Sequence, residues 1–531
     1  MNQRTLFARC FPSLNDFTFL APAILLFCLM GGVASMLVDG DTGWHLQAGE
    51  WILQHHQVPT VDFFTFTKSG QPWFAFEWLW DATFAFLNRV AGMPAVILGN
   101  LIVLGLMSMH LYRLVLSTSR NHAFAAGTTL LALLGMSLYL LARPQLVSFL
   151  FAVILLRLLE RWRESQRGFP WMIVLLLVVW TNAHPGFTAG IIILGAYTAG
   201  DLANALTASD AQRRTELLLQ FRRSAMLTAA CLVAALLNPY GLRLYSHIFS
   251  FLSDSYPYEH INEYKVVDFR TAPGRVFELM LFLSAPAAIS RLLKRDFSVP
   301  VLFLVWAHLA LTAQRNIPFF MIVMAGPVAL WVHEVMRTIA QAWGSGANSG
   351  SPEVQQRSEG GLPLEKAHGF PLLGILTMAL IFVLLRTPGS PPKFRPQYDP
   401  STYPEEAIGA VSQLGPSARL ITSDVWAGYL VHRLYPQIRI FWDGRADFYG
   451  TPYNLAAIDA LMGRPGWDKT LATHRVNAAL LPLNQPLASL LSQSKEWRVV
   501  YRGQLAILFQ HTEVSAESSK VSVARTSNPS L

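Results

Sequence analysis

Long apolar segments dominate this chain and limit what it can fold into. About eleven of them precede residue 388, and most approach the roughly 20 residues that a helix needs to cross a bilayer. Charged residues make up 14% of the sequence, against about 25% in soluble domains. The sequence therefore predicts an all-α polytopic membrane bundle. The segments lie at 17–38, 93–113, 123–141, 145–159, 170–183, 186–206, 224–239, 275–291, 297–313, 317–336 and 369–387.

Lys and Arg residues are concentrated in every second connection between these segments. This alternation is what the positive-inside rule predicts when the N-terminus is cytoplasmic, and about eleven spans then place the C-terminus outside. It accounts for the net charge of +8 without a nucleic-acid partner. The segment 76–91 is expected to lie at the membrane interface, since a span there would invert every later connection. The basic connections contain Arg4 and Arg9, Arg113 and Arg120, Arg157 to Arg167, Arg213 to Arg223, Arg291 to Arg295, and Arg337.

The rest of the chain divides by composition. Residues 1–387 form the predicted membrane domain, with a first outside loop at 39–92 and a Gly- and Ser-rich cytoplasmic linker at 341–368. Residues 388–511 are predicted to form a small extracytoplasmic domain, Pro-rich at its start, in which strands alternate with helices as in α/β folds. The polar residues 512–531 are predicted to be a disordered tail.

The first outside loop begins directly after the first apolar segment and contains Asp39, Asp41 and His45. A helix over 42–55 would place Asp41 and His45 on one face, with a carboxylate and an imidazole close together at the bilayer boundary. A structural explanation is also open, because an Asp at this position commonly caps a helix and Trp residues commonly anchor a loop at the headgroups.

The loop sequence DGDTGWHLQAGEWILQHHQVPTVDFFTFTKSGQPWFAFEWL resembles a largely uncharacterised bacterial branch of the GT-C superfamily. Further similar segments are LARPQLVSFL, WTNAHPGF, LNPYGLRLY, QRNIPFF and VWAGYLVHRLYPQIRIFWDGRADFYG. Members of this superfamily are polytopic glycosyltransferases, among them protein mannosyltransferase-like and aminoarabinose transferase-like enzymes. The resemblance implies the bacterial inner (plasma) membrane, a polyprenyl-phosphate sugar donor, and a glycan, lipid or protein acceptor.

The resemblance also implies roles for particular residues. Asp41 would be the general base that accepts the acceptor's proton, with Asp39 as the second choice. The leaving lipid phosphate needs cationic donors near the outer boundary, although contact with lipid headgroups is an alternative role for each Arg. The predicted substrate-binding residues are His45, Arg143, His184, Arg243, Glu263 and Arg315.

Three further points bear on the site. No cofactor is predicted with certainty, but Asp39 and Asp41 are candidate ligands for a divalent cation together with substrate phosphates. The related transferases carry a Lys-Pro-Pro-like element late in the first loop, where this sequence reads QPWFAFEWL. In FWDGRAD, Asp443, Arg445 and Asp447 are predicted either to bind an acceptor sugar or, the favoured alternative, to hold the domain together through an Arg–Asp pair.

The predicted function is transfer of a sugar from a polyprenyl-phosphate-linked donor to an extracytoplasmic acceptor. Two alternatives stay open on the sequence. A transporter or lipid flippase would also be polytopic, although no internal repeat is present and the charges cluster at the outer boundary. A non-catalytic membrane scaffold would use the C-terminal domain to bind a partner or a glycan.

Overall fold

The computed structural model describes residues 11–165, 167–344 and 370–512. Most of the predicted linker at 341–368 and, apart from Thr512, the predicted tail at 512–531 lie outside these residues. The chain divides into two compact units. Unit 1 comprises Met1–Ser35 and Pro94–Arg395, and unit 2 comprises Met36–Met93 and Pro396–Leu531.

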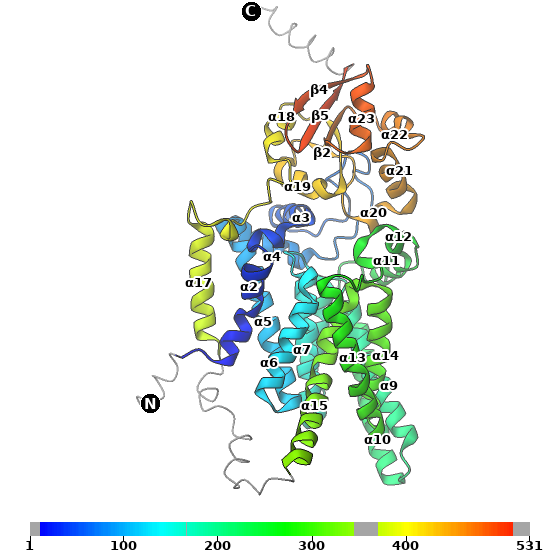
Figure 1. The fold of residues 1–531 in the computed structure, drawn as a ribbon. Coiled ribbons are helices and arrows are strands. Elements are labelled where there is room, and N and C mark those ends of the chain that lie inside the picture. The colour runs from blue at the N-terminus through cyan, green and yellow to red at the C-terminus, as the bar shows by residue number, and fades with distance from the viewer. Residues whose placement is uncertain (1–10, 166, 345–369, 513–531) are drawn as a thin grey trace, which may run out of the picture. The chain divides into compact units, whose positions relative to one another are not determined.

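Unit 1 consists of helices (Figure 1), and each predicted apolar segment overlaps one of them. The prediction for 224–239 is wrong at its start, because the helix there spans Ala211–Ala234 and so contains the predicted basic connection Arg213 to Arg223. The main helices are α2 (Leu14–Leu29), α5 (Met93–Ser119), α6 (His122–Gly135), α7 (Gln145–Ser165), α8 (Trp171–Ala183), α9 (Phe187–Thr207), α10 (Ala211–Ala234), α13 (Ala272–Leu293), α14 (Ser298–Thr312), α15 (Ile317–Gly344) and α17 (Leu372–Arg386). Short elements occupy the connections: η2 (Ser137–Tyr139), α11 (Leu242–Leu252), α12 (Tyr256–His260), η3 (Asn262–Tyr264) and η4 (Gln314–Asn316).

Several of these helices suit a membrane. In the described part of the chain, five helical segments are long and apolar enough to cross a bilayer: Met93–Ser119, Phe187–Thr207, Ala211–Ala234, Ala272–Leu293 and Gln314–Trp343. The helices α2, α6, α8, α14 and α17 are apolar but shorter. The number of spans, about eleven, stays a prediction.

The first helix differs from its predicted bounds. It ends at Leu29, and not at Val38, because Gly31 and Gly32 have φ angles of +85° and +101°, in the left-handed region that only glycine adopts without strain. The short helix η1 (Val33–Leu37) follows. Apolar composition continues past the two glycines, so composition alone gave the wrong end.

Unit 2 contains the α/β domain. Its strands are β1 (Arg419–Thr422), β2 (Arg439–Ile440), β3 (Ala478–Pro482), β4 (Trp497–Arg502) and β5 (Ala506–His511), and the predicted combination of strands and helices is present. The sheet order is β2-β1-β3-β5-β4, with β1 parallel to β2 and β3, and β5 antiparallel to β3 and β4. Helix α18 (Ile408–Ser412) precedes β1. The helices between strands are α19 (Asp424–Leu434), α20 (Ala446–Tyr449), α21 (Thr451–Leu461), α22 (Trp467–Thr473) and α23 (Pro486–Gln493).

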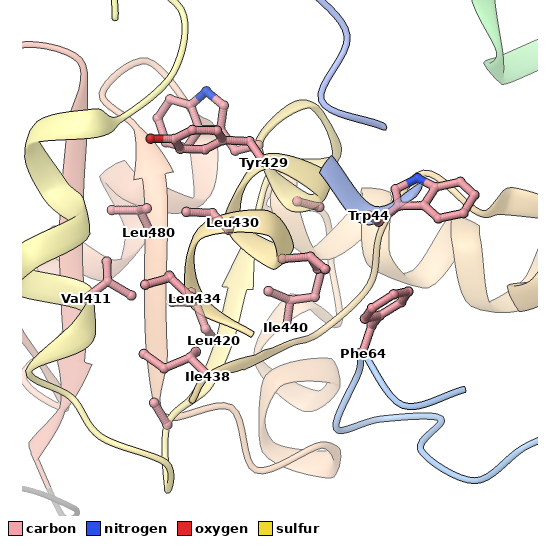
Figure 2. Packing of buried hydrophobic residues seen from close by; sticks show 14 of the residues in the cluster. Trp44, Phe64, Val411, Leu420, Tyr429, Leu430, Leu434, Ile438, Ile440 and Leu480 are labelled. Atoms are coloured by element: carbon pink, nitrogen blue, oxygen red, sulfur yellow. The ribbon is translucent and has the colours of Figure 1, made fainter. Parts of the chain in front are cut away.

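The first outside loop folds as part of unit 2. It forms α3 (Asp41–His55), close to the predicted helix over 42–55, and α4 (Trp78–Ala91), close to the predicted interface segment. Trp44, Phe64 and Trp73 are buried in one hydrophobic cluster with Leu420, Leu430 and other residues of the C-terminal chain (Figure 2). The core of the α/β domain is therefore completed by residues from near the N-terminus.

The loop also covers the edge of the sheet. Thr65 forms a parallel bridge with Ile440 of β2, and the N–H of Phe66 donates to the carbonyl of Ile440 at 3.2 Å. An unpaired strand edge invites association with other chains, and this segment occupies the open side of β2.

Candidate active site

The two acidic residues predicted as catalytic lie at the start of α3. Asp41 is the first residue of the helix, and its backbone N–H donates to Oδ1 of Asp39 at 2.9 Å. Asp39 thus satisfies one of the N–H groups that a helix leaves open at its N-terminus. The N-cap residue is Gly40, so neither aspartate is the helix cap, and both side chains are partly exposed.

The carboxylate of Asp41 lies directly against Gly444 of the FWDGRAD segment. A β-carbon built on Gly444 would overlap Oδ1 of Asp41 and lie 3.1 Å from its Cγ. Gly444 itself is exposed, so this contact is at the surface of unit 2. A larger residue at position 444 would therefore collide with the Asp41 carboxylate.

Further close contacts fix α3 on α19. A β-carbon on Gly40 would overlap the carbonyl of Val425, and one on Gly43 would overlap the carbonyl of Gly428. Gly40, Gly43 and Gly428 thereby let α3 and α19 approach backbone to backbone. This packing holds the start of α3 in a defined position beside the sheet.

This position is the carboxyl edge of the parallel strands. Asp424 follows β1 and Gly444 follows β2, so both lie at the edge where open α/β sheets place ligands. Asp424 is within electrostatic reach of Asp39. The structure thus brings together two segments that the sequence identified separately, the acidic loop and FWDGRAD.

Two tyrosines border the same carboxylates. Burial raises the pKa of Tyr398 well above its ordinary value. Smaller contributions in the same direction come from Tyr403 and then from the charges of Asp39 and Asp41. The Tyr403 hydroxyl donates to the carbonyl of Val38 at 2.8 Å. The Tyr398 hydroxyl is buried and has no hydrogen-bond partner among the described residues. Buried hydroxyls are almost always bonded, so this one is suited to a bound molecule.

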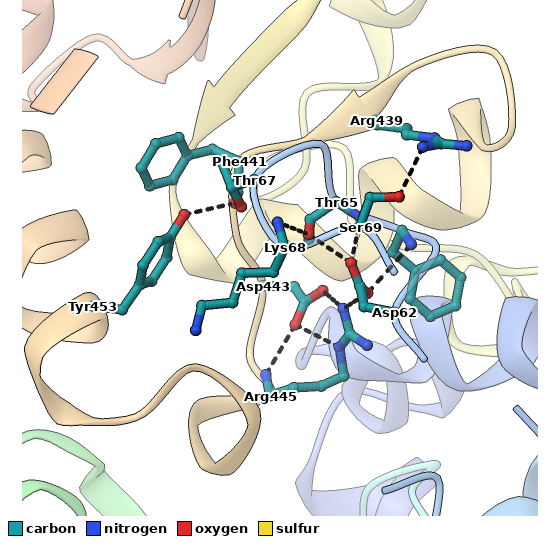
Figure 3. A network of polar contacts seen from close by, with 11 residues as sticks. Asp62, Thr65, Thr67, Lys68, Ser69, Arg439, Phe441, Asp443, Arg445 and Tyr453 are labelled. Atoms are coloured by element: carbon teal, nitrogen blue, oxygen red, sulfur yellow. Dashed lines mark hydrogen bonds and ion pairs between the residues drawn. The ribbon is translucent and has the colours of Figure 1, made fainter. Parts of the chain in front are cut away.

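Arg445 is structural. Its guanidinium lies 2.7 Å from Asp62 and 2.6 Å from Asp443, and Arg445 is only 3% exposed. Figure 3 shows Arg445 between these two carboxylates. Burial opposes its charge, but Asp443, Tyr449 and Asp62 raise the pKa of Arg445 well above its ordinary value. The predicted Arg–Asp pair is confirmed, and Asp62 is a partner that the sequence did not indicate.

His45 occupies the interface between α3 and α4. Its Nδ1 lies 2.8 Å from Oδ1 of Asp81 and its Nε2 lies 3.6 Å from Glu77, while the ring stacks on Trp44. Burial, with a contribution from Glu77, raises the pKa of Asp81 well above its ordinary value. The His45 side chain is 1% exposed, so it is placed to fix the two helices on each other rather than at a surface.

Unit 1 brings four of the predicted substrate-binding residues together. Arg315 in η4 lies 3.5 Å from Glu263 in η3, and its guanidinium stacks 4.2 Å from the ring centre of Tyr264. Arg143, which precedes α7, and Arg315 both act electrostatically on His184. These residues come from connections that the charge pattern predicts on one side of the membrane.

His184 is held in a chain of hydrogen bonds. The Ser148 hydroxyl lies 2.8 Å from Nδ1 of His184, and the Trp180 indole donates to the same hydroxyl at 2.7 Å. Burial, followed by Arg315 and Arg143, lowers the pKa of His184 well below its ordinary value. A neutral imidazole beside two guanidinium groups leaves the local charge positive. Arg243 differs from this group, since its side chain is exposed on α11.

The arrangement of metal-binding side chains bears on the divalent cation predicted at Asp39 and Asp41. Within residues 11–165, 167–344 and 370–512, no group of three or more His, Cys, Asp or Glu side chains is arranged to hold a metal ion. Asp39 and Asp41 would need substrate phosphates and water to complete the oxygen ligands of a divalent cation, so this site stays a prediction.

Comparison with solved structures identifies the fold. The oligosaccharyltransferase of Archaeoglobus fulgidus in its apo form aligns with a TM-score of 0.54 at 12% identity, covering 88% of this chain and 69% of its own. Oligosaccharyltransferases of this kind are GT-C glycosyltransferases. This chain has the GT-C fold.

Other alignments extend over similar lengths. The same archaeal enzyme, AglB, in complex with an inhibitory peptide and a dolichol-phosphate gives a TM-score of 0.53 at 12% identity, covering 92% of this chain and 70% of that one. ArnT from Cupriavidus metallidurans in the apo state gives a TM-score of 0.47 at 14% identity, and the alignment covers 92% of this chain and 96% of that one. No protein-family model and no curated protein sequence matches the chain. The predicted fold class, a helical membrane bundle with a small α/β region, is confirmed.

Proposed function

We propose that this protein is a membrane glycosyltransferase that moves a sugar from a polyprenyl-phosphate-linked donor to an acceptor outside the cytoplasm. The observation that carries the proposal is the position of Asp41 on a GT-C fold. This carboxylate heads the first α-helix after the first apolar helix and lies at the surface against Gly444. One neighbour of the same fold binds a dolichol-phosphate, which is a polyprenyl phosphate.

The proposed reaction is a single displacement with inversion at the sugar. The acceptor hydroxyl attacks C1, its proton passes to the Asp41 carboxylate, and the bond from C1 to the phosphate oxygen breaks. The electron pair of that bond leaves with the polyprenyl phosphate. Asp39 orders the first turn of α3 by accepting the Asp41 N–H, so in this scheme it positions the base.

Arginine side chains suit the leaving group. Arg143 and Arg315 carry permanent positive charge beside a neutral His184, and guanidinium groups bind phosphate oxygens through paired hydrogen bonds. We assign these two residues to the donor phosphate, with Glu263 holding Arg315 in place at 3.5 Å. Arg243 is retained as a third contact to the donor.

The proposed setting is the bacterial plasma membrane, with a cytoplasmic N-terminus and the α/β domain outside. This orientation rests on the alternation of basic connections. It puts Asp41 and the arginine group on the side where a lipid-linked sugar would be used.

The test is a transfer assay with the full chain in membranes and a panel of labelled polyprenyl-phosphate sugars. Asp41→Asn keeps the size of the side chain but removes the base, and we expect loss of at least about a hundredfold in rate. Asp468→Asn changes an exposed carboxylate of the same unit and is the matched control. Transfer that is unchanged in Asp41→Asn removes this residue from the mechanism. Movement of intact donor across the membrane without transfer favours a flippase.

A further inference from the structure

A second basic group lies away from the proposed transferase residues, on α5 and α7. It consists of His110 and Arg113 on α5 and of Arg157 and Arg161 on α7. Nη1 of Arg157 contacts Nδ1 of His110, which joins the two helices. A guanidinium has only donors, so His110 accepts this bond and is neutral. All three arginines act electrostatically on His110, which places them around one point.

The positive charge of the two arginines on α7 is poorly balanced. Arg157 and Arg161 are four residues apart and so share one face of α7, where like charges repel. Among the described residues, neither forms an ion pair with a carboxylate. Glu160 acts on Arg157 but is shared with Arg163. The contrast within the same helix is informative, because Arg163 binds Asp201 through two hydrogen bonds of 2.6 and 2.7 Å.

The group is also set back from the helix ends. Arg113 precedes the end of α5 at Ser119 by about 9 Å of helix, and Arg157 precedes the end of α7 at Ser165 by about 12 Å. Both side chains are partly buried, and α5 is apolar and long enough to cross a membrane. Arg113 is further fixed by a 2.9 Å bond from its Nε to Asn15. A partly buried charge is costly unless it has a partner or a role.

We propose that His110, Arg113, Arg157 and Arg161 form a binding site for a phosphate group. Clustered guanidinium groups match the geometry of phosphate oxygens, and a bound anion balances the charges of Arg157 and Arg161. An anionic phospholipid headgroup and a soluble phosphate share this chemistry. The site is separate from the arginines assigned to the sugar donor.

The test measures lipid retention by the full chain. The purified protein is stripped of lipid in detergent and exposed to equal amounts of phosphatidylglycerol and phosphatidylcholine, and the bound lipid is counted by native mass spectrometry. In parallel, inorganic phosphate is added to the lipid-free protein and the unfolding temperature is recorded. The double variant Arg157→Gln/Arg161→Gln removes two charges of the group. Arg213→Gln/Arg214→Gln on the exposed start of α10 removes two charges elsewhere.

We expect wild-type protein to prefer the anionic lipid by about tenfold, which is what one or two charge-assisted hydrogen bonds provide. The α7 variant should lose this preference and the α10 variant should keep it. Arg157→Lys/Arg161→Lys keeps the charge but not the paired geometry, and should retain part of the preference. If inorganic phosphate raises the unfolding temperature of the wild type and of the α10 variant but not of the α7 variants, the site exists and its ligand is a soluble phosphate. Equal binding of both lipids without phosphate stabilisation, or equal losses in the α7 and α10 variants, would overturn the proposal.

Discussion

The guanidinium of Arg445 binds the carboxylate of Asp62, a residue 383 positions earlier in the chain, at 2.7 Å. Both side chains are almost completely buried. Aromatic rings surround the charge, with the centres of Trp73, Phe64 and Phe448 4.5 to 5.0 Å from the guanidinium carbon. The pair ties the first outside loop to the segment that follows β2, and so it supports the surface on which Asp41 lies.

Removing Arg445 should destabilise unit 2 strongly. Arg445→Met leaves Asp62 and Asp443 buried without their cation, which typically costs about 3–5 kcal/mol. The unfolding temperature of the purified protein measures this loss. Arg439→Met is the control, because Arg439 is exposed and contacts only the Ser69 hydroxyl among the interactions described for its side chain. The triple change Arg445→Met/Asp62→Asn/Asp443→Asn should recover part of the stability, and no recovery would contradict the assignment.

Gly444→Ala should reduce activity more than stability. The new methyl group would overlap Oδ1 of Asp41 and push the carboxylate away. A displacement of about 1 Å at a catalytic group can cost about a hundredfold in rate. The transfer assay above, run with the unfolding temperature, separates the two effects. Gly409→Ala in α18 is the control, because a β-carbon on Gly409 would meet no atom within 4 Å, and it should leave both activity and unfolding temperature unchanged. Equal losses of activity in the two variants would argue against a role for the Gly444 contact.

Tyr398→Phe should lower the rate of transfer while leaving the unfolding temperature unchanged. The hydroxyl it removes is buried beside Asp39 and Asp41 and bonds to none of the described residues, so its partner is expected to be the substrate. Tyr403→Phe is the matched comparison. It removes a bond to Val38 and should lower stability by about 1 kcal/mol. Full activity of Tyr398→Phe would exclude a substrate contact.

Arg315→Gln and Arg143→Gln should weaken binding of the donor. Each removes a charge assigned to the lipid phosphate, and a charge-assisted hydrogen bond contributes about 1.5–3 kcal/mol, so KM for the donor should rise about tenfold or more. The assay varies donor at saturating acceptor. Arg275→Gln is the control, since Arg275 is exposed and donates to the carbonyl of Arg270. A rise in KM that is equal in the control would point to a general effect of surface charge.

The contact between Glu50 and Arg89 should make the packing of α3 on α4 sensitive to acid. The hydrogen bonds from Arg89, at 2.7 and 2.8 Å, lower the pKa of Glu50 from its ordinary value of 4.5, against the opposing effect of burial. A carboxyl whose pKa is lowered by folding adds stability above its unfolded pKa, and this contribution disappears as the pH falls through the folded pKa.

Glu50→Gln should therefore unfold at a slightly lower temperature than wild type at pH 7, and the difference should fade as the pH falls below the ordinary pKa of 4.5 and through the lower folded pKa. Because both side chains are partly exposed, the effect is small and should shrink further at high salt. Arg89→Gln should show the same pH profile, and a double variant should add nothing. A difference that persists at low pH would show that Glu50 acts through packing instead.

The sequence by itself determined the membrane character, the helical segments and the strands of the α/β domain. Apolar length and alternation are local properties, so each predicted apolar segment overlaps a helix, and the C-terminal region contains strands and helices as predicted. The same local signal failed at Gly31 and Gly32, where composition stays apolar while the backbone leaves the helix. The position of Asp41 at the head of α3 also followed from the sequence, because helix N-termini carry a recognisable acidic start.

Only the tertiary structure decided which distant residues meet. Gly444 against Asp41, Asp62 with Arg445, and Asp81 with His45 are contacts between segments that are separated by turns or by hundreds of residues. No local pattern encodes such pairings, because each depends on how helices and strands pack and on which buried charge needs a partner. For the same reason the sequence assigned the first outside loop to the range of the membrane domain, whereas its Trp44 and Phe64 complete the core of the α/β domain.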